Sequence, residues 1–141
     1  MAERVRVTLR WIQILDKMEP FYKDRGEFRF TARVATDVGA QIQETRFPTE
    51  GHYEISDHPA WNKLNLDRVI FEGDVSERLT VELMGEELDT LSANDQLDHY
   101  KRVFEGGADA WVGVYGPGDE GRTTDPENMS NWRVNYSIER A

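Results

Sequence analysis

Three acidic side chains that follow a short alternating segment are the residues of this sequence best suited to chemistry. Glu87, Asp89 and Asp95 come directly after residues 79–83, with one residue between the first two acids and five before the third. Carboxylates two residues apart leave a strand end on the same side, and a short loop can return the third carboxylate to them. Calcium takes carboxylate and carbonyl oxygens from such flexible loops, so the spacing predicts a calcium site. The alternative interpretation is a solvated acidic loop without a ligand.

A second acidic loop, at residues 16–27, joins the first two alternating segments of the chain. It contains Asp16 and Glu19, and Glu19 is followed by Pro20 and Phe21. An opening strand, an acidic loop with an acid-Pro-aromatic step and a later strand that ends in the acid-x-acid-x5-acid loop together resemble a C2 domain. In C2 domains two such loops, at one end of an eight-stranded sandwich, hold calcium, and many members then bind anionic phospholipid.

The resemblance implies a set of site residues in this chain. The calcium ligands would be Asp16, Glu19, Glu87, Asp89 and Asp95. The apolar loop residues that could contact a lipid surface are Phe21, Tyr22 and Leu91, with Met18 nearby, although such residues also serve as loop anchors. The chain departs from the family pattern because glutamate stands at positions 19 and 87, because Asp16 precedes Glu19 by only three residues, and because Asp98 stands where a glycine commonly closes the third loop.

Alternation of apolar and polar residues predicts the strands that must position these loops. It is clearest at residues 5–11, 28–34, 79–83 and 132–138, and shorter strands are predicted at 40–47, 52–55, 68–71, 100–104 and 110–115. After Trp11 the apolar positions shift to Ile12 and Ile14, which predicts a β-bulge or a change of buried face. Many short strands joined by turns favour an antiparallel β-sandwich of about eight strands, C2-like, with at most one short helix. Residues 95–104 are the helical candidate, because Leu97, Tyr100 and Phe104 have helical spacing.

Length and composition exclude several classes of protein. The chain has 141 residues, a formal charge of -10 and no cysteine, which excludes thiol catalysis, iron-sulfur clusters and disulfide frameworks. We expect a single domain over residues 1–141, without a transmembrane segment or secretory signal, and a cytoplasmic location. The acidic balance argues against binding nucleic acid, whose phosphates attract lysine and arginine. Since no nucleophile is accompanied by a recognisable base, we expect a non-enzymatic binding module. Its expected ligands are calcium and either an anionic phospholipid or a protein partner.

Two other functions remain open from the sequence. Of the four tryptophans, Trp11 and Trp132 lie in alternating segments and are predicted to be core residues, whereas Trp61 lies in a polar loop. An exposed Trp61 would fit a carbohydrate-binding sandwich with a structural calcium ion. The other alternative is a calcium-independent protein-interaction domain. Arg29 and Arg33 give one predicted strand a basic face, which could meet an anionic headgroup or pair with acidic groups of the surface.

Overall fold

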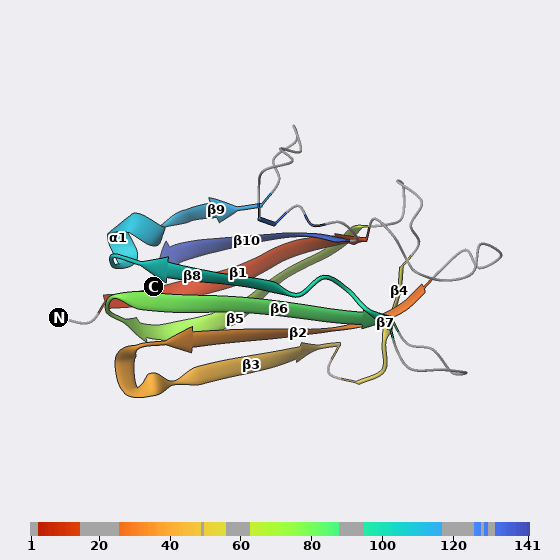
Figure 1. Cartoon of the computed structure of the whole chain (residues 1–141), viewed down its shortest axis with the longest axis horizontal. Coiled ribbons are helices and arrows are strands. Elements are labelled where there is room, and N and C mark those ends of the chain that lie inside the picture. Colours follow the sequence, from red (N-terminus) through yellow and green to blue (C-terminus); the bar gives the residue numbers. More distant parts are fainter. Residues whose placement is uncertain are drawn as a thin grey trace.

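The chain forms two antiparallel β-sheets that pack face to face (Figure 1). The computed structural model describes residues 3–14, 26–48, 50–55, 63–87, 95–116, 126–127, 129 and 132–141. The elements in these parts are β1 (Glu3–Ile14), β2 (Gly26–Thr36), the 3-10 helix η1 (Val38–Ala40), β3 (Ile42–Phe47), β4 (Tyr53–Ile55), β5 (Lys63–Val75), β6 (Arg78–Glu87), β7 (Asp95–Gln96), β8 (Tyr100–Glu105), α1 (Ala108–Trp111), β9 (Gly113–Tyr115) and β10 (Trp132–Arg140).

In the described part of the chain the first sheet has four strands and the second has six. The first sheet has the order β5-β1-β10-β9, and the second has the order β3-β2-β6-β7. In the second sheet β3 and β4 pair in succession with one edge of β2, while β7 and β8 pair in succession with one edge of β6. The predicted fold class, an all-β antiparallel sandwich with one short α-helix, is therefore confirmed.

Strand β1 shows how the apolar pattern determines which face is buried. Val5, Val7 and Leu9 are buried, and after a shift of phase Ile12 and Ile14 are buried as well. The pairing of β1 with both β5 and β10 shifts register between Leu9 and Trp11, so a bulge is present, as predicted, but it lies before Trp11 and not after it. The bulge puts two successive residues outside the core, so Trp11 is only half-buried and its prediction as a core residue was wrong. Trp132, by contrast, is 1% exposed, as predicted.

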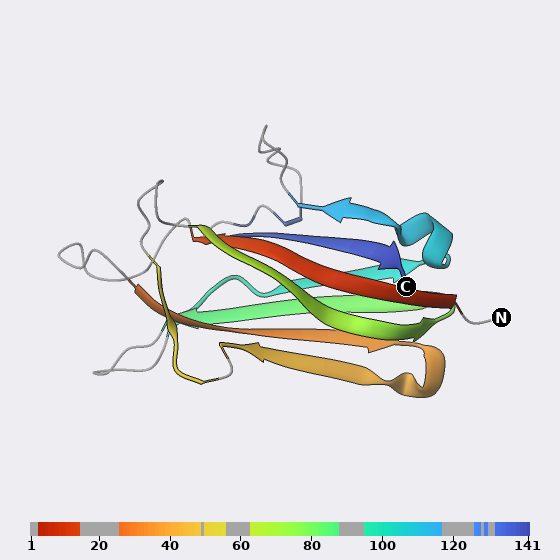
Figure 2. The same ribbon diagram turned by 180° about the vertical axis from the view of Figure 1, so that it is seen from behind.

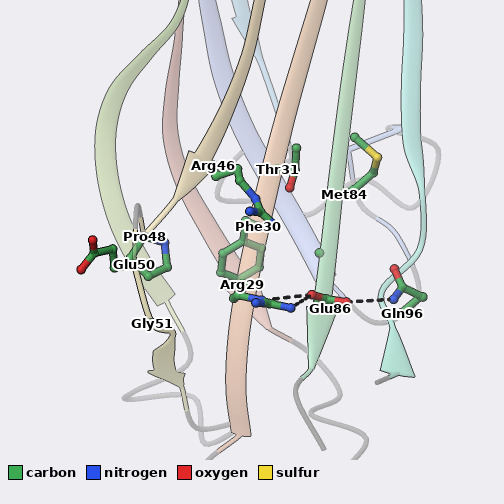
Figure 3. A pocket seen from close by; sticks show the side chains of 11 residues that line it. Arg29, Phe30, Thr31, Arg46, Pro48, Glu50, Gly51, Met84, Glu86 and Gln96 are labelled. Atoms are coloured by element: carbon green, nitrogen blue, oxygen red, sulfur yellow. Dashed lines mark hydrogen bonds and ion pairs between the residues drawn. The ribbon is translucent and has the colours of Figure 1, made fainter. Parts of the chain in front are cut away.

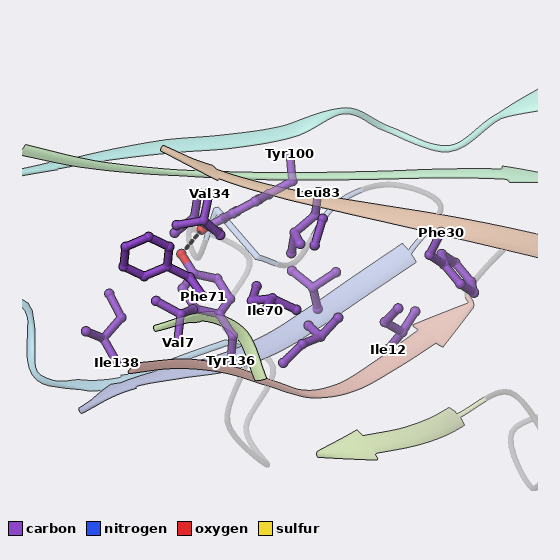
Figure 4. Close-up of a cluster of buried hydrophobic side chains, with 14 of the residues drawn as sticks. Val7, Ile12, Phe30, Val34, Ile70, Phe71, Leu83, Tyr100, Tyr136 and Ile138 are labelled. Carbon is purple, nitrogen blue, oxygen red and sulfur yellow. Dashed lines mark hydrogen bonds between the residues drawn. The ribbon is translucent and has the colours of Figure 1, made fainter. Parts of the chain in front are cut away.

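The hydrophobic core fills the space between the two sheets (Figure 4). Its aromatic part centres on Phe30, whose ring stacks against Phe28, Phe47 and Trp132 at centroid distances between 5.7 and 6.2 Å. The aliphatic part consists of the inward residues of the central strands, including Val7, Val34, Ile70, Leu83 and Ile138. Burial of these side chains provides the main driving force for closing the sandwich.

A buried polar network joins the sheets along the side formed by β8, β9 and β10. The hydroxyl of Tyr100 donates to Glu127 Oε2 at 2.5 Å and lies 2.6 Å from the hydroxyl of Tyr136, as Figure 4 shows for the two tyrosines. Arg102 Nη1 donates to the same carboxylate oxygen at 3.0 Å, and its guanidinium lies 4.9 Å from the centre of the Tyr115 ring. Since Glu127 is 3% exposed, this cation compensates a buried charge.

The helical alternative for residues 95–104 was wrong and the strand predicted at residues 100–104 is confirmed, because this stretch forms β7 and β8. Tyr100 and Phe104 lie opposite Leu83 and Leu79 of β6, so their burial follows strand spacing. The helical spacing arose from Leu97, which lies in the irregular turn between the two strands and donates its amide to the carbonyl of Gly85. None of the helices in the described parts is long and apolar enough to span a membrane.

Both chain ends lie at the same end of the sandwich, as the two opposite views show (Figures 1 and 2). Val5 pairs with Arg140, and the amide of Ala141 donates to the carbonyl of Arg4 at 3.0 Å. At the other end of the same strands, Ile14 pairs with Trp132. The two ends of the sandwich therefore differ: one carries the described chain ends and the other carries the ends of β1 and β6.

Candidate functional site

The two predicted acidic loops are attached at one end of the sandwich. Strand β6 ends at Glu87, which pairs with Phe28 near the start of β2 and with Asp95 at the start of β7. In Figure 1 the end of β1 and the start of β2 lie at this same end. The described residues that flank segments 15–25 and 88–94 therefore lie at the same end of the sandwich, which the predicted calcium site requires.

The register brings two of the predicted ligand positions face to face. The backbones of Glu87 and Asp95 are directly opposite in the antiparallel pair of β6 and β7, where Cα atoms are about 4.5–5.5 Å apart. Glu87 is 2% exposed and has the same phase along β6 as the buried Leu83 and Gly85. Its carboxylate thus belongs to the inward face of the sheet, at the margin of the core.

The remaining predicted site residues lie outside the part of the chain that the structure describes. They are Asp16, Glu19, Asp89, Phe21, Tyr22, Leu91 and Trp61. Within the described residues no three Asp, Glu, His or Cys side chains form a group that could hold a metal ion. The prediction of calcium ligands therefore stays a prediction, and the structure adds to it only the placement of Glu87 and of the backbone of Asp95.

A pocket of about 250 Å³ opens beside this end, on the outer face of the second sheet (Figure 3). Strand β2 contributes Arg29 and Thr31, and β3 contributes Arg46. Strand β6 contributes Met84 and Glu86, and β7 contributes Gln96. Glu86 and Glu87 are consecutive in β6, so their side chains point to opposite faces of the sheet. Glu86 lines the pocket, and Glu87 lies on the inward face, next to the end of the sandwich that carries segments 15–25 and 88–94.

Glu86 is held from both sides within the pocket. Arg29 donates to Glu86 Oε1 from Nε at 3.0 Å and from Nη2 at 2.5 Å, and Gln96 Nε2 donates to Glu86 Oε2 at 3.2 Å. Figure 3 shows these three side chains in a line across β2, β6 and β7. Such a two-donor contact from an arginine fixes the carboxylate in position, so this line forms a rigid polar rim.

Arg46 is the guanidinium in this pocket that remains available to a ligand. It makes no ion pair with any residue that the structure describes, whereas Arg33, further along β2, lies within 2.9 Å of Glu44 and 3.6 Å of Glu82. The hydrogen bond and the charge of Glu44 raise the pKa of Arg33 above its ordinary value. Arg29 and Arg33 therefore pair with acidic groups of the surface, which was one of the two interpretations that the sequence left open.

The pocket has a lining of mixed charge, with two arginines, Arg29 and Arg46, and two acids, Glu50 and Glu86. Arg46 supplies a permanent cation, Thr31 a hydroxyl and Met84 a polarizable apolar surface, around a hollow large enough for a small charged group. Sequence reasoning identified Arg29 but missed Arg46, Thr31 and Met84. Their positions in the alternating strands indicate that their side chains point outward. The sequence alone does not tell which strands are neighbours, so it could not bring these residues together in one pocket.

Comparison with known proteins gives no family for this chain. No family model matches it, and no curated protein matches it. The fold and the site define an antiparallel β-sandwich with a pocket of mixed charge on the outer face of its second sheet.

Proposed function

We propose that this chain is a non-enzymatic binding module that takes calcium at the acidic end of the sandwich and then docks to an anionic lipid surface. The observation that carries the proposal is the register that puts Glu87 opposite Asp95, at the end where β1 ends and β2 begins. Five carboxylates on two loops at one end would repel one another without a cation. Calcium would neutralise them and turn a negative tip into one that can approach a negative membrane.

The pocket beside this end supports the lipid part of the proposal. A phosphate or carboxylate of a headgroup could pair with Arg46 while calcium bridges the loops to the same surface. Because Arg29 is already committed to Glu86, the pocket offers one free cation among its lining residues rather than a broad basic surface. Binding through this pocket should therefore depend on calcium and be weak without it.

Calcium binding can be tested by thermal unfolding of chelator-treated protein, with magnesium at equal ionic strength as the control. A site saturated about a hundredfold over its Kd adds about 2.7 kcal/mol to the free energy of unfolding and raises Tm by several degrees. The variant Asp89→Asn/Asp95→Asn should lose this shift. A matched variant, Asp74→Asn/Glu105→Gln, removes two exposed acids at the opposite end and should keep it. An unchanged shift in the first variant would show that the ligands are misassigned.

Lipid docking can be tested by co-sedimentation with phosphatidylcholine–phosphatidylserine vesicles in the presence of calcium. Arg46→Gln should weaken binding about fivefold, since one basic residue at a membrane surface contributes about 1 kcal/mol. Lys101→Gln makes the same change of charge on β8, outside the pocket, and should have a smaller effect. Binding that is equal with and without calcium, or equal for vesicles of pure phosphatidylcholine, would contradict the proposal.

A further inference from the structure

The outer face of the first sheet carries a half-buried tryptophan that the proposed function does not use. The bulge between Leu9 and Trp11 leaves Trp11 half-buried outside the core, and its backbone pairs with Asn65 of β5 on one side and with Asn135 of β10 on the other. The ammonium of Lys63 lies 4.5 Å from the centre of the ring. We name Arg10, Trp11, Lys63, Asn65 and Asn135 the Trp11 face.

The cations of the Trp11 face differ from those elsewhere on the same sheet. Arg4 and Arg6, earlier on β1, form ion pairs with Glu72 at 3.5 and 2.7 Å. Arg10 and Lys63 have no ion pair with any described residue, although the chain as a whole has a charge of -10. Arg10 Nη1 instead donates to Asn135 Oδ1 at 3.2 Å, and Asn135 is 5% exposed, so a buried amide orients this guanidinium.

The geometry of this face fits a sugar ring that carries an acidic group. The half-buried ring of Trp11 provides an apolar platform at the surface, and the exposed amide of Asn65 can both donate and accept hydrogen bonds, as sugar hydroxyls require, while the buried Asn135 orients Arg10. A strand bulge interrupts the pairing ladder, and bulges are frequent where a side chain is re-aimed at a ligand. Arg10 and Lys63, which have no ion pair among the described residues, add charge complementarity to a carboxylate.

We propose that the Trp11 face binds an acidic saccharide, with a pyranose ring stacked on Trp11 and its carboxylate paired with Lys63 and Arg10. Lys63 is exposed, and a cation–π contact at an exposed site is weak, so the side chain can swing aside and keep its ammonium within reach of the sugar carboxylate. This inference is independent of the proposed calcium site, which shares no residue with the Trp11 face.

The probe is the trisaccharide of galacturonic acid, and its methyl ester serves as the uncharged counterpart. Titration followed by tryptophan fluorescence and calorimetry should show binding of the acid and about tenfold weaker binding of the ester. Trp11→Ala should abolish binding and its fluorescence change, Trp11→Phe should restore part of the binding because a ring remains, and Lys63→Gln should weaken binding severalfold. Lys101→Gln, an equal change of charge on the other sheet, should leave binding unchanged.

Thermal unfolding of each variant separates loss of binding from loss of fold. If Trp11→Ala unfolds, the exposed positions Lys63 and Asn65 still test the site, since Lys63→Gln and Asn65→Ala remove no core contact. The proposal is overturned if the acid does not bind at millimolar concentration, if acid and ester bind equally, or if Lys63→Gln and Asn65→Ala both bind like the unchanged protein.

Discussion

At the scale of single residues, the buried carboxylate of Glu127 is the most demanding feature of the protein. It accepts hydrogen bonds from Tyr100 and Arg102, and Tyr136 joins the same network through Tyr100. A buried charge is tolerated only when it is paired and hydrogen-bonded. The network therefore holds the turn at residues 126–127 against both sheets, and its loss should be felt in stability.

Glu127→Gln should lower the free energy of unfolding by about 2–4 kcal/mol, because it removes the buried carboxylate that Tyr100 and Arg102 hydrogen-bond and leaves the half-buried Arg102 without its ion partner. Urea denaturation measures this change. Glu105→Gln breaks the exposed pair with Arg78 and should cost less than about 1 kcal/mol. Equal effects of the two substitutions would mean that Glu127 is not buried in solution.

The two tyrosines of this network also predict how stability depends on alkaline pH. Burial, ahead of the nearby Tyr136 and Glu127, raises the pKa of Tyr100, and burial likewise raises the pKa of Tyr136. Above about pH 10 tyrosines of the unfolded chain ionise while these two stay protonated in the fold, so the unfolded state binds fewer protons. The free energy of unfolding should fall as pH rises above that value. Tyr100→Phe should make this fall shallower, as measured by denaturation between pH 8 and 11.

At the scale of elements, the sequence predicted most strands but not which strands pair with one another. Alternation identified β1, β2, β6 and β10, because each has one buried face. It underestimated β5, predicted at residues 68–71 and observed at Lys63–Val75, because the early part of that strand has few fully buried residues. The bulge in β1 was visible in the sequence but its position was not, and so Trp11 was assigned to the wrong face. Strand order, which assembles the Arg46 pocket, depends on contacts distant in sequence.

The packing of the 95–99 segment on β6 depends on one glycine. A Cβ atom at position 85 would lie 2.6 Å from Leu97 Cδ1 and 3.0 Å from Phe30 Cδ1. Gly85→Ala should therefore lower the free energy of unfolding by about 1–3 kcal/mol through overpacking. In a Leu97→Ala background the same substitution should cost less, because the nearest clash is gone. Additive effects in this double-mutant cycle would show that Leu97 does not cover Gly85.

At the scale of the whole molecule, the excess of acidic groups dominates the electrostatics. Many arginines of the described surface are already ion-paired, among them Arg4, Arg6, Arg29, Arg33, Arg78 and Arg140. Exposed pairs contribute little to stability, whereas a charge of -10 repels itself in the compact state. The general effect of salt and the specific effect of calcium must therefore be measured separately.

Raising sodium chloride from about 10 to about 200 mM should increase Tm, because the Debye length shortens and the repulsion among acidic groups is screened. Differential scanning calorimetry in a buffer without divalent ions measures the change. A fall in Tm would mean that the cross-strand ion pairs outweigh this repulsion, and the calcium experiment would then need a different ionic background.

The position of the two described chain ends determines how this protein can be tethered. Glu3 and Ala141 lie at the end of the sandwich opposite to Glu87 and the Arg46 pocket. A tag, surface anchor or neighbouring domain joined at either terminus would be attached at the end of the sandwich opposite to Glu87. The end that carries Glu87 and the Arg46 pocket would then point away from the attachment. Immobilisation through either terminus should therefore leave vesicle binding equally accessible, which makes the protein well suited to measurements on a sensor surface.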